Sequence, residues 1–182
     1  MSNTLPVPKR VITGHNAQGQ STAIIVEDAP TGPFMPGSET KIARLWTTKE
    51  TPANNDDQKT DFKDVIPERF GLVQPNGSQA CIIDTPPGGG SPTHRTSSID
   101  YIILISGTLT LLLDTDDRSS PDAGTTLSVP GSIFVQRGTK HTWMNRSTTE
   151  WVRFVAVMID AKPVDVEKDG KEVEALREGF DV

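Results

Sequence analysis

The chain has 182 residues, of which 34% are hydrophobic and 23% charged, and its formal net charge is −6. This length suits one domain, spanning residues 1–182, and is short for two. The Lys and Arg residues are dispersed, and no run approaches the roughly 20 apolar residues that span a bilayer, so we expect no nucleic-acid and no membrane partner. The single cysteine excludes an internal disulfide framework, and the first thirty residues hold no apolar block typical of a signal peptide, so we expect a cytoplasmic protein.

In chain order, strand patterns appear first at residues 21–28 and 40–48, and residues 48–61 form a polar loop broken by Pro. From residue 78 the pattern becomes dense, with turn residues between seven short apolar runs: 78–84, 97–105, 108–114, 125–130, 132–136, 141–145 and 150–160. Such a series predicts an all-β antiparallel sandwich or barrel, with a core at about residues 20–160. We expect the N-terminal strand to pack on the sheet edge. Residues 169–180 predict a short amphipathic helical tail outside the barrel.

Polar residues recur at every second position of the run that begins at residue 94, although strongly apolar strands surround it. Side chains two residues apart in a strand share a face, and one face of this run would carry His94, Thr96, Ser98, Asp100 and Ile102. The same rule groups His141, Trp143 and Asn145. Polar groups inside a barrel cost roughly 1–3 kcal/mol each unless they are satisfied, so several on one wall indicate a site. A single strand histidine is more often just a hydrogen-bonded residue, and His15 reads as a surface residue in a turn.

Two spacings in this region resemble the two sequence motifs of the cupins. In residues 88–107, Gly88 is followed at the motif's intervals by His94, Thr96, Asp100 and Gly107. The second motif covers residues 131–145. It contains Gly131, Gly138, His141 and Asn145, and Gln136 takes the position of the family's Pro one residue early. The resemblance implies a small single-domain cupin, a double-stranded β-helix or jelly-roll barrel, of a kind found in bacteria and fungal biosynthetic clusters.

The chain departs from the cupin pattern at the metal site. Cupins generally bind metal through two His and one Glu of the first motif and one His of the second, whereas here Thr96 replaces a His and Asp100 replaces the Glu. The resemblance therefore implies either one divalent metal (Fe, Mn, Ni or Zn) on His94, Asp100 and His141, or a site that works without metal.

Without metal, the same three residues offer acid–base chemistry. An imidazole titrates near neutrality, and a carboxylate and an imidazole across a cavity suit proton abstraction beside a carbonyl and protonation of a leaving hydroxyl. We therefore expect Asp100, His141 and His94 to be catalytic. The expected substrate-binding residues are Thr96, Arg95, Arg137, Trp143 and Asn145. For each Arg an ordinary surface ion pair is an equally good interpretation.

Three functions remain open at this stage. The first is an acid–base lyase, dehydratase, isomerase or cyclase that acts on a small molecule, such as an aromatic or polyketide-like secondary metabolite. The second is a metal-dependent oxidoreductase or oxygenase, and the third is a module that binds a small molecule without catalysis. Because exposed sheet edges invite association, we also expect a homodimer.

Overall fold

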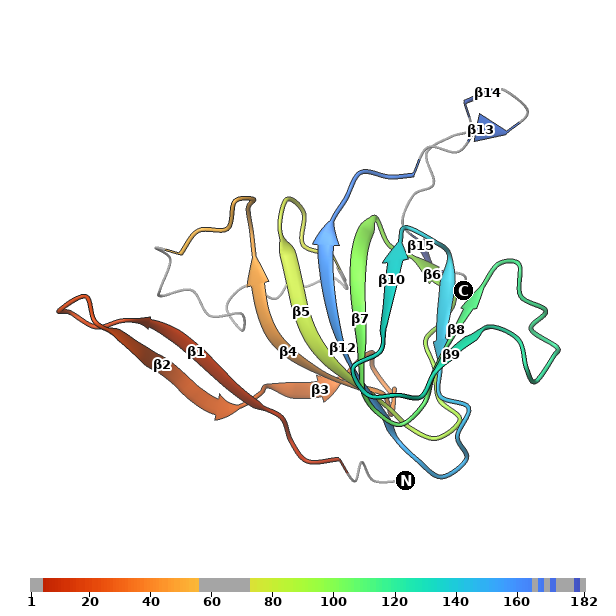
Figure 1. Ribbon diagram of the computed structural model, residues 1–182, viewed down its shortest axis with the longest axis horizontal. Coiled ribbons are helices and arrows are strands. Elements are labelled where there is room, and N and C mark those ends of the chain that lie inside the picture. Colours follow the sequence, from red (N-terminus) through yellow and green to blue (C-terminus); the bar gives the residue numbers. More distant parts are fainter. Residues whose placement is uncertain (1–4, 56–72, 165–166, 169–170, 173–178, 181–182) are drawn as a thin grey trace.

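The computed structural model describes residues 5–55, 73–164, 167–168, 171–172 and 179–180, and its strands form two larger antiparallel sheets. The first sheet has six strands in the order β10 (Ile133–Arg137), β7 (Ser98–Ser106), β12 (Val152–Asp160), β5 (Ser78–Thr85), β4 (Lys41–Thr48) and β3 (Thr31–Pro33). The second has five, in the order β15 (Gly179–Phe180), β6 (His94–Arg95), β11 (His141–Met144), β8 (Leu109–Leu113) and β9 (Thr125–Leu127). Figure 1 shows the two sheets curving around one interior. The expectation of an all-β jelly-roll barrel is confirmed.

Alternating burial along the strands places one apolar core between the sheets. Buried residues alternate with more exposed ones along β7, and Ile102 and Leu104 are among the buried residues that point inward. Phe154 on β12 and Trp143 on β11 meet them from the neighbouring strand and from the other sheet, and all four belong to the same buried cluster. The turn after β7 needs Gly107, whose φ is 78° and whose added Cβ would lie 2.6 Å from the carbonyl oxygen of Trp151.

The N-terminal residues differ from the expectation. The predicted strand at residues 21–28 is β2 (Ser21–Asp28), but it pairs with β1 (Lys9–His15) in a separate two-stranded sheet that extends away from the barrel (Figure 1). The edge of the six-stranded sheet is instead formed by β3. His15 ends β1 and is exposed, so it is a surface residue on a strand rather than in a turn.

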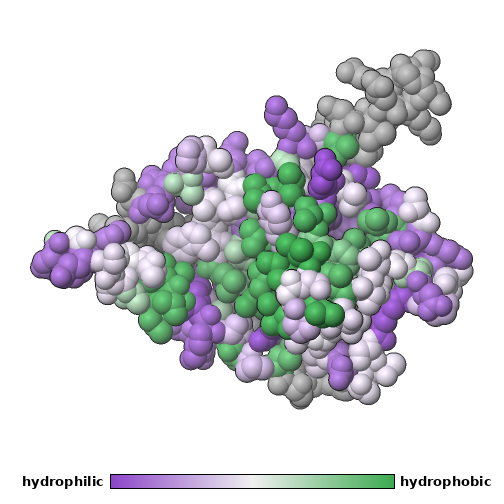
Figure 2. All heavy atoms as spheres, viewed as in Figure 1, coloured by the Kyte–Doolittle hydropathy of each residue, from purple (hydrophilic) through white to green (hydrophobic). Residues whose placement is uncertain are grey.

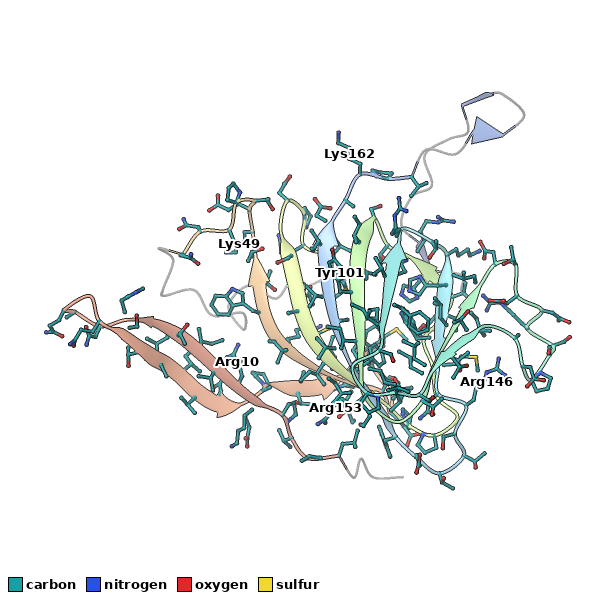
Figure 3. The ribbon with its side chains drawn as sticks, viewed as in Figure 1. Arg10, Lys49, Tyr101, Arg146, Arg153 and Lys162 are labelled. Carbon is teal, nitrogen blue, oxygen red and sulfur yellow. The ribbon has the colours of Figure 1, made fainter. Side chains whose placement is uncertain are left out.

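Two buried arginines tie the N-terminal residues to the barrel (Figure 3). Arg153 makes two 2.6 Å contacts with the carboxylate of Asp84 across β12 and β5, and its Nη1 donates to the carbonyl of Pro6. Arg10 pairs with Glu27 inside the hairpin, and it donates to the carbonyl of Leu45 on β4 at 3.3 Å. Both interactions join segments that are distant in the sequence.

The predicted C-terminal helix falls mostly on residues 173–178, which lie outside the described residues. The described stretches around them are two-residue strands: β13 (Glu167–Lys168) pairs with β14 (Lys171–Glu172), and β15 pairs with β6. No helix within the described ranges is long and apolar enough to cross a membrane.

The outer surface of the six-stranded sheet is largely apolar. Figure 2, seen from the same side as Figure 1, shows hydrophobic residues gathered over the middle of this sheet. The interior of the barrel lies behind these strands, and the predicted chemistry is on that inner side.

Candidate active site

The chain passes from one sheet to the other between His94 and Asp100. His94 lies on β6 of the five-stranded sheet, whereas Asp100 lies on β7 of the six-stranded sheet. The predicted single strand is therefore two strands, but its burial pattern is as expected. His94, Thr96 and Asp100 are each 4–5% exposed, while Tyr101 is 39% exposed. The alternating side chains face the same interior because the two sheets enclose it.

His94 and His141 form a direct cross-strand pair. They are opposite each other in the register of β6 and β11, and their ring centroids are 4.3 Å apart with planes tilted by 52°. Nδ1 of His94 lies 2.9 Å from the carbonyl oxygen of Pro92. A carbonyl only accepts hydrogen bonds, so this contact favours a proton on Nδ1 and an unprotonated Nε2 in the neutral ring.

His141 is held by two partners on its own side of the barrel. Its Nδ1 lies 2.9 Å from the carbonyl oxygen of Thr139 and 3.0 Å from Nε2 of Gln136. Gln136 also donates to Thr139 at 2.9 Å, and only 2% of its surface is exposed. A proton on Nδ1 of His141 can be donated to Thr139, which again leaves Nε2 as the unprotonated nitrogen. No role was predicted for Gln136, because its position opposite Asp100 depends on the pairing of β10 with β7, which the sequence pattern does not reveal.

Burial keeps both imidazoles uncharged at neutral pH. The pKa of His141 falls to about 4, chiefly because burial disfavours the charged ring, and further because of its neighbours His94 and Arg95. The Thr139 carbonyl opposes this shift. Burial likewise lowers the pKa of His94, against the opposing effect of the Pro92 carbonyl. Each ring is therefore neutral at pH 7, and its lowered pKa makes it a weaker base than a free imidazole and its imidazolium a stronger acid than a free imidazolium.

The two imidazoles line a cavity between the sheets. Its polar lining comprises Thr40, Thr85, Ser91, His94, Thr96, Asp100 and His141, and its other lining residues are Phe34, Cys81, Ile83, Gly90, Ile102, Trp143, Phe154, Ala156 and Met158. The volume open to the centres of water molecules is about 50 Å³, and one water needs roughly 10–15 Å³ of such volume. The cavity is therefore large enough for several waters or a small ligand. The polar groups of the first motif thus meet a predominantly apolar wall.

Four further lining residues complete this picture. Thr96 donates a long hydrogen bond, 3.4 Å, to the carboxylate of Asp100. Burial raises the pKa of the Cys81 thiol to about 12, which keeps it protonated and inert, as expected for a core residue. Phe34 and Thr40 reach the cavity from the N-terminal part of the chain. Sequence analysis missed them because no local pattern marks their approach to the site.

Of the predicted substrate-binding residues, Thr96 and Trp143 lie at the cavity and the other three do not. Asn145 is fully buried, but its side-chain amide donates to carbonyls of the surrounding loops, those of Thr85, Pro86 and Glu150. We therefore assign it to holding these loops together. Arg95 donates to the carbonyl of Gly138 at 2.6 Å, and Arg137 points outward from β10 and is exposed. Neither Arg lines the cavity.

The donor set supports only part of a metal centre. The two imidazoles are adjacent, and each has its Nδ1 on a backbone carbonyl, the usual second contact of a metal-binding histidine. Yet among the described residues no three His, Cys, Asp or Glu side chains are grouped so that they could hold one ion. Protein metal centres of this kind use at least three such ligands. The set of His94, Asp100 and His141 thus stays a prediction.

Comparison with known proteins gives relatives that match nearly the whole chain. It is 35% identical over 172 residues to the Phomopsin biosynthesis cluster protein D of Diaporthe leptostromiformis, covering 93% of this chain and 86% of that protein. It is 32% identical over 170 residues to the cupin-domain-containing oxidoreductase virC of Hypocrea virens, covering 89% and 83%. No protein-family model matches. The polyketide cyclase RemF from Streptomyces resistomycificus superimposes with a TM-score of 0.46 and 18% identity over 72% of this chain and 73% of that one.

Proposed function

This chain belongs to the cupin family, and we propose that it is an enzyme of secondary metabolism that performs acid–base chemistry on a small, largely apolar substrate. The observation that carries the proposal is the pair of imidazoles of His94 and His141, whose ring centroids are 4.3 Å apart and which line one cavity together with the carboxylate of Asp100 and many apolar side chains. The names of these relatives, a biosynthesis cluster protein and a cupin-domain oxidoreductase, support an enzymatic role in such a pathway.

In the proposed reaction, Nε2 of one imidazole removes a proton from a carbon beside a substrate carbonyl. The carbon–hydrogen bond breaks, and its electron pair moves into an enolate. The imidazolium then returns the proton, either to a leaving hydroxyl, which departs as water, or to another carbon. The first outcome is a dehydration and the second an isomerisation. No external oxidant or reductant is needed, because dehydration and isomerisation are both redox-neutral. The proton held on the imidazolium can exchange with solvent before the ring delivers a proton and becomes neutral again.

The other lining residues have positioning roles in this proposal. Asp100, on the same cavity, offsets the charge of the transient imidazolium, and Thr96 orients that carboxylate through its hydroxyl. The carbonyl of Thr139 accepts the proton of Nδ1 of His141 and thereby leaves Nε2 as the nitrogen for the substrate, while Gln136 donates to the same carbonyl. Trp143 and Phe154 contribute aromatic side chains to the cavity wall, which favours a flat apolar substrate such as an aromatic or polyene-like molecule.

The test exploits proton removal itself, so the natural substrate need not be known. The protein is incubated in D₂O with a panel of enolisable aryl ketones and aryl β-hydroxy ketones, and deuterium uptake is measured by mass spectrometry. We expect uptake in at least one compound and a fall of about 10²- to 10⁴-fold in His141→Gln, because Gln cannot exchange a proton near neutral pH. His15→Gln, at an exposed position, is the matched control and should keep the wild-type rate. No uptake across the panel, or uptake that survives both His94→Gln and His141→Gln, would contradict the proposal.

A metal-dependent oxidoreductase is the second candidate, and the adjacent imidazoles, together with the name of the virC relative, are what favour it. His94 and His141 would supply two ligands, and Asp100 is the predicted third. Protein purified without a chelating tag would then carry near-stoichiometric Fe, Mn, Ni or Zn by elemental analysis. His94→Ala and Asp100→Ala would each abolish that metal. Metal retained by both variants would exclude this ligand set.

A further inference from the structure

The cavity between the sheets has hydrogen-bonding side chains at both of its ends, and only one end holds the acid–base groups. Strand register gives the order of the lining residues. On β5 these are Cys81, Ile83 and Thr85, which alternate with residues that face the other side and therefore follow one another along the cavity wall. Thr85, the last residue of β5, stands at one end of this row.

Asp100 lies far from Thr85 on the same six-stranded sheet. In the register of β7, β12 and β5, Asp100 is opposite Met158, and Met158 is opposite Gln79. The segment of β5 from Gln79 to Thr85 extends about 20 Å. Asp100 and Thr85 therefore mark opposite ends of the cavity.

The five-stranded sheet gives the same order. His94 lies opposite His141 at the start of β11, whereas Gly90, another lining residue, is bridged to Met144 at the end of that strand. The strand extends about 10 Å between these two pairs. Ser91, which follows Gly90 and also lines the cavity, is thus displaced from the imidazoles along β11.

Ser91 and Thr85 belong to the same end of the cavity, because Asn145 joins their segments. Asn145 follows β11 directly, and its side-chain amide donates to the carbonyl of Thr85 at 3.1 Å. Its backbone N–H donates to the carbonyl of Gly89 at 2.9 Å, in the loop that leads to Ser91. The two sheets therefore meet at this end, away from His94 and Asp100.

Apolar side chains connect the two ends. The ring centroid of Trp143 is 5.2 Å from that of His141 and 6.1 Å from that of Phe154. Phe154 lies opposite Ile83, the lining residue that precedes Thr85 on β5. An apolar wall thus leads from the imidazoles to Thr85.

Three hydroxyl groups gather at the end marked by Thr85. Lys41 lies opposite Asp84, so the next step of the same register sets Thr40 beside Thr85. Both threonines line the cavity and are buried, 8% and 4% exposed. The hydrogen bonds that the structure describes for them use backbone atoms, so their hydroxyls remain for a ligand. The hydroxyl of Ser91 accepts from the N–H of Trp143 at 3.0 Å and keeps its proton for a further acceptor.

We propose that Thr40, Thr85 and Ser91 form a second binding site, the hydroxyl subsite, which holds a hydroxyl or carbonyl group at the far end of the substrate. The strand lengths place the two polar ends roughly 10–20 Å apart. Hydrogen bonds of about 3 Å at each end leave roughly 4–14 Å between the polar atoms of the substrate itself. Two fused aromatic rings with one polar group at each end have this length, and the apolar wall suits their rings.

The hydroxyl subsite selects a neutral group. Its three hydroxyls carry no charge, and the titratable residues that line the cavity are Cys81, His94, Asp100 and His141, none of which belongs to the subsite. A buried carboxylate or phosphate would lack a cation to offset its desolvation there. The substrate class is therefore a hydroxylated bicyclic aryl ketone. Placing its ketone at the imidazole end rests on the proposed function, whereas the hydroxyl subsite itself does not.

The experiment compares two ketones that differ only in the distal hydroxyl, 1-(6-hydroxynaphthalen-2-yl)ethanone and 1-(naphthalen-2-yl)ethanone. Isothermal titration calorimetry with the full chain gives their dissociation constants without any turnover. We expect the hydroxylated ketone to bind wild type about 5- to 10-fold more tightly, because it gains a buried neutral hydrogen bond. In the double variant Thr40→Val/Thr85→Val this ratio should fall below about 2. Thr22→Val, at an exposed position of β2, is the matched control and should keep the wild-type ratio.

Circular dichroism checks that each variant is folded, and the two single variants replace the double variant if it does not fold. Equal dissociation constants of the two ketones in wild type, or no binding of either at about 1 mM, would overturn the hydroxyl subsite. So would a wild-type ratio retained in the threonine variants.

Deuterium uptake by the same two ketones in D₂O separates this proposal from the proposed reaction. Selective binding without uptake at the methyl carbon would support the hydroxyl subsite and count against the reaction. Uptake from both ketones with equal affinity would support the reaction and overturn the hydroxyl subsite.

Discussion

Replacing His141 with Gln should make the folded protein less sensitive to acid. His141 is 1% exposed, and burial and its neighbours lower its pKa to about 4. In the unfolded chain the same ring titrates near 6.5. Between these two values the unfolded state binds the proton and the folded state does not, so stability is lost as the pH falls from 6.5 towards 4. Gln can keep a hydrogen bond to the residues around it but does not titrate.

The size of the effect follows from the two pKa values. A shift from 6.5 to about 4 corresponds to a total loss of about 3 kcal/mol once the pH is below both values. At pH 5 the linkage relation gives about 2 kcal/mol, and above pH 7.5 it gives nearly zero. No large correction for solvent screening is needed, because the ring is almost wholly buried.

Urea unfolding from pH 8 to pH 4.5 in buffer with a chelator measures this directly. The free energy of unfolding of wild type minus that of His141→Gln should fall by about 2 kcal/mol between pH 8 and pH 5. The test uses only the change of this difference with pH, because the substitution also changes packing and thereby shifts the difference at every pH. His15→Gln, at an exposed site, should follow the wild-type curve. Parallel curves for wild type and His141→Gln would refute the lowered pKa of His141.

Three stability predictions rest on buried contacts. Asp84→Asn removes the carboxylate that pairs with the buried Arg153 and should lower the free energy of unfolding by about 3–5 kcal/mol in urea titration. A loss below about 1 kcal/mol would mean that water solvates the guanidinium instead. Asn145→Ala removes the amide that joins the two loops and should cost about 1–3 kcal/mol, visible as a lower thermal midpoint, and an unchanged midpoint would contradict the structural role that we assign to it. Phe154→Ala, at a position 1% exposed, should lower the free energy of unfolding by about 3–5 kcal/mol in the same titration. A loss well below that range would mean that the neighbouring side chains collapse into the space left by the ring.

The sequence predicted which side chains face the interior better than it predicted their strands. Alternation along residues 94–102 indicated an inward row that includes His94 and Asp100, and the residues of that row are buried in the structure. It did not reveal that the chain changes sheet between these two residues. A period of two reports the direction of each side chain, whereas the pairing partner depends on contacts that are distant in sequence.

The limits of prediction at the site have the same cause. Nothing near Phe34 marks it as a lining residue, since its segment reaches the cavity only when β3 and β4 join the sheet. Asn145 fitted a site residue by spacing, but its amide is taken by backbone carbonyls. The motif position of Asn145 correctly indicated that the residue is buried, but it did not indicate which groups its side-chain amide contacts. Gln136, the residue that replaces the family's Pro, was recognised only as a departure from the motif.

The proposed reaction requires the imidazoles of His94 and His141 to act as bases without a bound metal. The most direct measurement is the rate of deuterium uptake by an active aryl ketone as a function of bound metal, determined by elemental analysis on the same samples. We expect the rate to stay constant when chelation lowers the metal content below about a tenth of an equivalent, because the proposed proton transfer uses only side chains of this chain. A rate that falls in proportion to the lost metal, and returns when one divalent ion is added back, would contradict the account.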